Sequence, residues 1–288
     1  MLEDDLVDRT QGSVTPFLRL DEVLLGHATD LRAALGDNFI GLYPIGSLVI
    51  GDFDLTSDVD FSVVTAHEMS DSDVERVQRI HTELVGRDSR WVRHLEYSFI
   101  SMTELHRMSS PYGPGGERIL TPERDLWYFG NGAATIHRSD HDNTVVTRWT
   151  LRYASGAVVG PQPVSFAPAI STTELSQEIR TSLIGWAHLV RRNPSQFDNR
   201  FHQVFLVLND CRALQDLHEG RITSKWAGVN WAKRNLDVGW HALIDYCWRE
   251  RQDTTIHISQ PADQAAYQQT IEFMTYAAEL AERFESSP

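Results

Sequence analysis

The sequence predicts an α+β protein, with strands in the first part of the chain and helices in the rest. Before about residue 140, segments such as 59–65 alternate apolar with small or polar residues, which is the period of a strand. Beyond it, apolar residues recur every three or four positions, as in amphipathic helices. Since 288 residues suffice for two cores, we expect one domain over residues 1–140 and a helical bundle domain over residues 141–288.

Composition restricts the class of partner. The chain carries 26 Lys and Arg against 40 Asp and Glu residues, a net charge of −14. We therefore expect no nucleic acid partner, because phosphate neutralisation needs a basic surface. An acidic protein would instead attract a cationic small molecule. The charge gives no indication of the oligomeric state.

A cytoplasmic location is expected from two features. Residues 1–8 are acidic and lack a long apolar run, so neither a signal peptide nor a membrane anchor is expected. The two cysteines, Cys211 and Cys247, lie within apolar helical patterns. They are predicted to be buried thiols of a reducing compartment.

The first elements lead to a glycine-serine pair. An opening helix over roughly residues 16–35 precedes a strand over residues 39–45, which runs directly into Gly46 and Ser47. A short helix could begin there. Glycine at a helix start lets backbone N–H groups approach phosphate oxygens, and the Ser47 hydroxyl would add a further contact.

Two carboxylates follow on the next strand. Asp58 and Asp60 stand at positions i and i+2, so they project to one face, about 7 Å apart along the backbone. Oxygen ligands of this kind suit Mg²⁺. Two such ions held about 4 Å apart can bridge a triphosphate and stabilise a leaving pyrophosphate.

Glu96 is the candidate for a third carboxylate. The segment 91–100 also alternates and places Val92, His94, Glu96 and Ser98 on one face. If this strand pairs with the preceding one, Glu96 lies beside Asp58 and Asp60. The alternative is an exposed strand glutamate with no catalytic role.

The second half contains clear helix signals. Ser171 and Glu174 form a capping box pattern before an apolar stripe that ends at residues 193–194. The next helix is expected to bury Phe201 and to stop at Gly220. Ser224 then suits the N-cap of a helix beginning near Lys225, so a cation and a helix N-terminus coincide in a way that favours an anion. The alternative is a solvated lysine.

These motifs resemble those of the aminoglycoside nucleotidyltransferases, in particular the streptomycin/spectinomycin adenylyltransferase type of the polymerase-beta-like nucleotidyltransferase superfamily. The matching residues are Gly46, Ser47, Gly51, Ser57, Asp58, Asp60 and Glu96. Two looser stretches, residues 140–142 and 220–225, extend the similarity over about residues 30–240.

The resemblance implies an N-terminal nucleotidyltransferase domain with a mixed sheet, and a helical domain completing the cleft for ATP and substrate. By that likeness Asp58 and Asp60 ligate Mg²⁺, with two ions expected. Glu96 would be the general base or a third ligand. Gly46, Ser47 and Ser57 would bind the nucleotide, and Lys225 would reach its triphosphate.

One segment departs from the family pattern. Streptomycin-type members carry an F-G-E-W segment whose Trp helps to hold the drug, whereas this chain has Phe129, Gly130, Asn131 and Gly132. The aromatic wall is missing at that position, although Trp127 or Tyr128 could substitute for it. The resemblance therefore supports the type of reaction more strongly than it supports the identity of the substrate.

The acidic and histidine residues at 137–142 admit several interpretations. No further His or Cys stands at zinc spacing, so a dedicated zinc site is not expected. Asp140 and Asp142 are expected to cap the helix that follows. Either could instead pair with an ammonium group of the substrate.

The sequence thus predicts Mg²⁺-dependent transfer of AMP from ATP to a hydroxyl of a small, cationic acceptor such as an aminoglycoside, with release of pyrophosphate. A non-catalytic nucleotide-binding regulator is the alternative from a different class. Adenylylation of another metabolite or of a protein is a further variant within the enzyme class.

Overall fold

A computed structural model describes residues 15–54, 56–87, 89–107, 113, 122–253 and 255–284. The expectation drawn from residues 1–8 falls outside these ranges. Among the helices in the described ranges, none has both the length and the apolar character needed to span a membrane.

The chain forms two compact units. The first comprises Met1–Gly51, Ser57–Ser109 and Thr121–Ala169, and the second comprises Asp52–Thr56, Ser110–Leu120 and Ile170–Pro288. The second unit thus begins its long segment further along the chain than the predicted division at residue 140. The reason is that Leu151, on the helix after that point, packs into a core cluster with Tyr43, Val64 and Ile100 of the sheet.

The first unit is built on a sheet with strand order β1-β2-β3-β4-β5. β2 and β3 are parallel and the other pairs are antiparallel, so the described sheet is mixed, as predicted. Its strands are β1 Phe39–Pro44, β2 Val59–Thr65, β3 Leu95–Ser101, β4 Leu126–Phe129 and β5 His137–Ser139. One detail of the prediction is wrong: Trp91–His94 is a 3-10 turn, so the strand that carries Glu96 begins only at Leu95.

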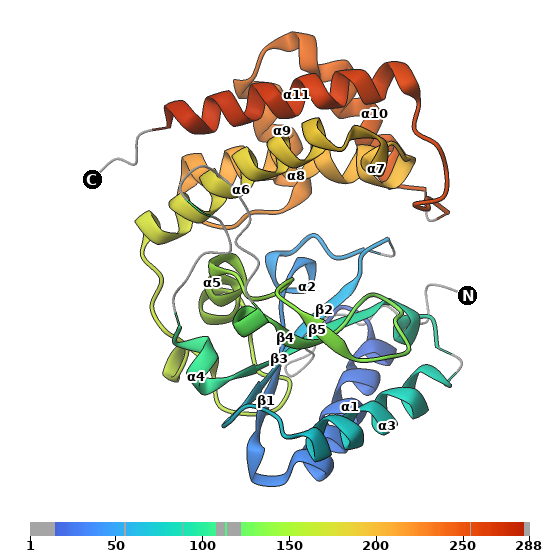
Figure 1. The fold of residues 1–288 in the computed structure, drawn as a ribbon, viewed down its shortest axis with the longest axis vertical. Helices are drawn as coiled ribbons and strands as arrows, with labels where there is room; N and C mark the ends of the chain where they lie inside the picture. Colours follow the sequence, from blue (N-terminus) through green and yellow to red (C-terminus); the bar gives the residue numbers. More distant parts are fainter. Residues whose placement is uncertain are drawn as a thin grey trace. The chain divides into compact units, whose positions relative to one another are not determined.

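The two faces of this sheet differ in chemistry. Phe61, Tyr97 and Phe129 align across β2, β3 and β4 on one face. His27 of α1 packs edge-on against the Phe61 and Tyr97 rings, so α1 covers this face, and α3 lies beside α1 (Figure 1). Because side chains alternate along a strand, Asp60 and Glu96 belong to the opposite face. The helices of this unit are α1 Leu18–Leu35, α2 Ser47–Ile50, α3 Asp71–Val85, α4 Met102–Leu105 and α5 Val145–Tyr153.

The second unit is helical, as predicted. Its helix α8 contacts α6, α9, α10 and α11. Two buried clusters form its core, one around Phe273 with Cys211 and Cys247, and one around Phe197 with Met274. The helices are α6 Thr172–Arg192, α7 Pro194–Phe197, α8 Arg200–Glu219, α9 Lys225–Asn235, α10 His241–Arg251 and α11 Gln264–Arg283.

Several local predictions in this unit are confirmed. Ser171 and Glu174 form the capping box of α6, and Gly220 ends α8 with a left-handed conformation. Cys211 and Cys247 are buried free thiols. The expected burial of Phe201 is wrong, because its side chain at the start of α8 is 41% exposed.

Candidate active site

Gly46 brings the backbone after β1 against a carboxylate of β2. Its φ is 58°, and a Cβ atom added there would lie 2.2 Å from Oδ2 of Asp60. Only glycine allows both this conformation and this approach. The Ile45 N–H also donates to the Asp60 backbone carbonyl at 2.9 Å. The short helix expected after Gly46 is present and begins at Ser47.

Asp60 and Glu96 are neighbours across two parallel strands. The register of β2 with β3 pairs Asp60 directly with Glu96, so the expected strand pairing occurs. Both residues are partly exposed between buried neighbours. Asp58 lies just before β2, and Ser57 beside it is buried. The first unit therefore gathers Gly46, Asp60 and Glu96 in one place.

Glu96 is held by hydrogen-bond donors from outside its own strand. The Tyr128 hydroxyl donates to Oε1 at 2.6 Å, and Nε2 of His141 lies 3.1 Å from the same oxygen. The backbone N–H of Asn131 also donates to this carboxylate. Burial raises the pKa of Glu96, but the bond and charge of His141 and the Tyr128 bond outweigh it, so the pKa lies below its usual value. Glu96 is thus a charged carboxylate at neutral pH.

The partners of Glu96 are themselves shifted by its charge. The hydrogen bond to Glu96 is the largest cause that raises the pKa of His141, to about 9, and the charge of Asp142 adds to it. Burial and the charge of Glu96 raise the pKa of Asp142. Burial, together with the same charge, raises the pKa of Tyr128. The Tyr128 hydroxyl therefore keeps its proton and remains a donor to Glu96.

Asn131 connects two of the predicted carboxylates. Its side-chain amide donates to Oδ1 of Asp58 at 2.5 Å, while its backbone N–H donates to Glu96. The neighbouring Gly132 has φ 66°, and a Cβ atom there would lie 2.9 Å from the Arg93 carbonyl oxygen. This turn is therefore built for glycine at position 132, where the resembling family carries its Trp.

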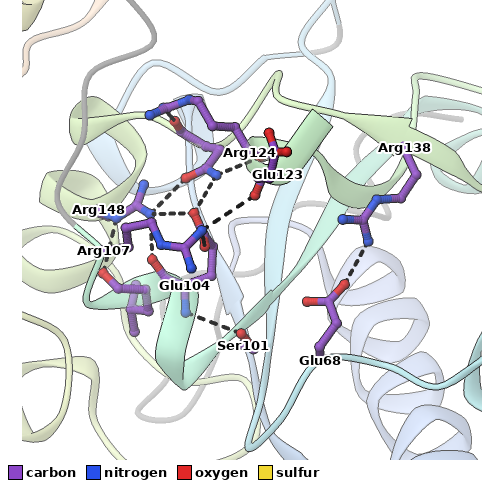
Figure 2. Close-up of polar contacts among 10 residues, drawn as sticks. Glu68, Ser101, Glu104, Arg107, Glu123, Arg124, Arg138 and Arg148 are labelled. Carbon is purple, nitrogen blue, oxygen red and sulfur yellow. Dashed lines mark hydrogen bonds and ion pairs between the residues drawn. The ribbon is translucent and has the colours of Figure 1, made fainter. Parts of the chain in front are cut away.

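A buried polar network fixes the segment that carries His141. Asn143 donates to Oε1 of Glu104 at 2.8 Å and accepts from Arg148 at 2.7 Å. Its backbone carbonyl accepts from Arg124 at 2.9 Å. Figure 2 shows Arg107, Arg124 and Arg148 gathered around Glu104. Because Arg148 is only 1% exposed, this network is a rigid support for the residues just before Asn143.

The sequence did not single out these supporting residues for their role. The sequence suggests Tyr128 only as a replacement for a missing aromatic wall. It suggests helix capping for Asp140 and Asp142, with contact to a substrate ammonium group as the alternative, but α5 begins at Val145 and its N-cap is Thr144. The expectation that Asp140 or Asp142 caps this helix is therefore wrong. Alternation along the strand of Tyr128 was the signal that could have placed it on the face of Glu96.

Lys225 lies in the second unit, as the first residue of α9. Ser224 is the N-cap and accepts from the Ala227 N–H, so the predicted helix start is confirmed. The Lys225 ammonium group lies 5.6 Å from the centre of the Phe205 ring, in cation–π geometry.

Among the described residues, no three or more His, Cys, Asp or Glu side chains form a group that could hold a metal ion as they stand. One oxygen of Asp58 and one oxygen of Glu96 accept hydrogen bonds from side chains of the protein. The donor set of Asp58, Asp60 and Glu96 is nonetheless all carboxylate, the chemistry that Mg²⁺ prefers.

Part of the chain matches a known family, and curated relatives match over a longer stretch. Residues 167–278 match the family model described as aminoglycoside adenylyltransferase, C-terminal domain. The spectinomycin 9-adenylyltransferases of Staphylococcus aureus strains Mu50 and N315 are each 27% identical over 226 residues, which cover 75% of this chain and 78% of theirs.

A solved structure shares the fold. It is the spectinomycin adenyltransferase AAD(9) from Enterococcus faecialis with ATP and spectinomycin. The match has a TM-score of 0.64 at 16% identity and covers 90% of this chain and 98% of that one. The solved structure shows the same fold. Together with the match over residues 167–278 and the 27% identical relatives, it supports the predicted resemblance to the aminoglycoside adenylyltransferases.

Proposed function

We propose that the protein transfers AMP from ATP to a hydroxyl group of a small cationic acceptor of the aminoglycoside class, spectinomycin being the first candidate. The observation that carries this proposal is the pairing of Asp60 with Glu96 at the point where Gly46 meets Asp60. The relatives named as spectinomycin adenylyltransferases support the acceptor class. The net charge of −14 suits a cationic acceptor.

In the proposed reaction the acceptor oxygen attacks the α-phosphorus of ATP. A bond forms between that oxygen and phosphorus, and the bond to the β-phosphate oxygen breaks, so pyrophosphate leaves. Glu96 accepts the hydroxyl proton, and Tyr128 and the backbone N–H of Asn131 hold its carboxylate in place. Gly46, Ser47 and Ser57 bind the phosphates, and Lys225 contacts the triphosphate.

Asp58 and Asp60 are the proposed Mg²⁺ ligands, with Glu96 as a possible third. When bound, the ions would neutralise the triphosphate and stabilise the leaving group. The all-carboxylate donor set and the pairing of Asp60 with Glu96 support this assignment. The residues of the chain itself then orient the nucleotide and keep Glu96 charged.

The test is pyrophosphate release from ATP with Mg²⁺ and a panel of aminoglycosides that includes spectinomycin. We expect release with at least one drug, and its loss in the Glu96→Gln variant. Silence across the panel with ATP binding intact by calorimetry would contradict the acceptor class. That result would instead favour another metabolite, a protein acceptor or a non-catalytic regulator.

A further inference from the structure

The segment between the two site motifs packs with the helical unit. Asp52–Thr56 joins Gly51 to Ser57, so it follows Gly46 and Ser47 and leads directly into Ser57, Asp58 and Asp60. It nevertheless belongs to the second compact unit. Its last residue, Thr56, stands two positions before Asp58 and four before Asp60.

Arg251, the last residue of α10, forms an ion pair with Asp54 in the middle of the segment. Its Nη1 donates to Oδ2 of Asp54 at 2.5 Å, and its Nη2 lies 3.4 Å from Oδ1. Bidentate arginine–carboxylate pairs of this kind fix the orientation of the two side chains as well as their distance. The Arg251 side chain is 12% exposed and that of Asp54 is 41% exposed, so the pair is partly buried on the arginine side.

Asp54 also accepts hydrogen bonds from Thr56, two positions further along the chain. Its Oδ1 accepts from the backbone N–H of Thr56 at 2.8 Å and from the Thr56 hydroxyl at 2.6 Å. Burial raises the pKa of Asp54, but the bonds from Arg251 and Thr56 lower it below the usual value. One carboxylate therefore fixes both Arg251 and the residue immediately before Ser57.

A second anchor holds the start of the segment. The Trp226 N–H, on the first turn of α9, donates to Oδ2 of Asp52 at 2.9 Å. A carboxylate is favourable at this end of a helix. The Trp226 ring packs against Trp248 at 4.7 Å, and the Arg251 guanidinium lies 5.5 Å from the Trp248 ring. The contacts of Asp52 and Asp54 are therefore both made by residues of α9 and α10, which pack together through Trp226 and Trp248.

We propose that Arg251 is a positioning residue, which holds Asp54 and thereby sets the placement of Asp58 and Asp60 for AMP transfer. The role of those two carboxylates rests on the proposed function. Arg251 itself need touch no reactant. Because a displacement of about 1 Å in a catalytic group can cost up to 10²-fold in rate, losing this clamp should act on kcat.

The test compares Arg251→Gln, Arg251→Lys and Asp54→Asn with a matched control, Lys233→Gln. Lys233 pairs with Asp245 at 2.6 Å and so also links α9 to α10, in an ion pair that includes neither Arg251 nor Asp54. For each full-length variant we would measure kcat, KM for ATP, the melting temperature and hydrogen exchange over residues 56–60.

For Arg251→Gln we expect kcat to fall about tenfold with KM for ATP little changed, and exchange over residues 56–60 to accelerate. Arg251→Lys should recover part of kcat, because it keeps the charge and loses the two-pronged geometry. The Asp54→Asn change should add little in the Arg251→Gln background, since the two side chains act as one unit. Lys233→Gln should leave kcat and exchange unchanged.

Equal effects of Arg251→Gln and Lys233→Gln on kcat would overturn the proposal, as would fully additive effects of the two clamp variants. Failure of the proposed function looks different, because the wild-type enzyme would then transfer AMP to no acceptor. In that case hydrogen exchange alone tests the positioning role of Arg251. Unchanged protection of residues 56–60 in the Arg251→Gln variant would contradict this role. Selective loss of protection there would support it.

Discussion

Glu96 on β3 and Asp216 on α8 are carboxyl groups withdrawn from solvent in different units, and their pKa values move in opposite directions. The hydrogen bonds of Glu96 to His141 and Tyr128, together with the charge of His141, lower its pKa against the effect of burial. Asp216 accepts the Thr223 N–H at 2.7 Å and the Thr223 hydroxyl at 2.5 Å. Burial still raises its pKa to about 6, because the charge of Arg212 and these bonds do not outweigh it.

Burial alone therefore does not decide the charge of a carboxyl group in this molecule. Glu96 has a cationic partner within 3.1 Å, whereas the bonds of Asp216 come from neutral Thr223. A charge-assisted bond is worth roughly twice a neutral one. The first unit therefore maintains a charge where the proposed chemistry needs it, and Asp216 serves α8 as a structural acceptor.

The largest effect is expected for Glu96→Gln. This change keeps the shape of the side chain but removes its charge and basicity, so kcat for AMP transfer should fall by about 10²–10⁴-fold. The far-ultraviolet circular dichroism should stay close to the wild type, while the melting temperature should fall somewhat because the charged bond with His141 is lost. If the variant retained more than about a tenth of the activity, Glu96 would not be the base in this reaction.

His27 extends the comparison to a buried base. Neither ring nitrogen has a hydrogen-bond partner among the described residues, and burial lowers the pKa of His27 to about 3. Below its unfolded value of 6.5 the unfolded chain binds the extra proton, so stability falls as pH drops toward 3, by on the order of 4 kcal/mol. His27→Leu should flatten this part of the pH–stability curve measured by urea unfolding. An unchanged slope would show that His27 is not its source.

Asp216→Asn tests the raised pKa of this buried carboxyl directly. A raised pKa means that the folded protein holds the proton more tightly, so stability is complete below the unfolded value of 3.8 and declines as pH rises through about 6. The amide resembles the protonated carboxyl, and the variant should gain up to about 3 kcal/mol at pH 7. Urea unfolding at pH 4 and pH 7 checks this. A variant less stable than wild type at pH 7 would contradict the assignment.

The smallest effect is expected for Tyr128→Phe. It removes one of the donors to Glu96, and a hydrogen bond to a charged group is worth about 1.5–3 kcal/mol. We expect kcat to fall about tenfold with KM for ATP nearly unchanged. Tyr153→Phe is the control, because Tyr153 is 48% exposed and lies in the same unit. If the two variants had the same kcat, Tyr128 would not contribute to the function of Glu96.

Strand alternation and a glycine-serine pair were enough to predict which side chains meet Asp60. The period of two placed Glu96 on the correct face, and parallel pairing then set it beside Asp60. Capping signals likewise fixed the starts of α6 and α9. Strand alternation and helix-capping motifs are local sequence patterns, and they were sufficient for these predictions.

The supporting shell of Glu96 could not be predicted in the same way. Tyr128 and His141 reach it only through the packing of β4 and of the segment before α5. The contact of Arg251 with Asp54 joins residues 197 positions apart in the chain. No local pattern encodes such contacts, because they depend on how whole elements pack.

AMP transfer is tested most directly by mass spectrometry of spectinomycin after incubation with ATP, Mg²⁺ and the protein. We expect the drug to gain the mass of one AMP group with the wild-type protein. We expect no gain with Glu96→Gln or when Mg²⁺ is chelated. An adenylylated product formed equally by the Glu96→Gln variant would contradict the central role assigned to the Asp60–Glu96 pair.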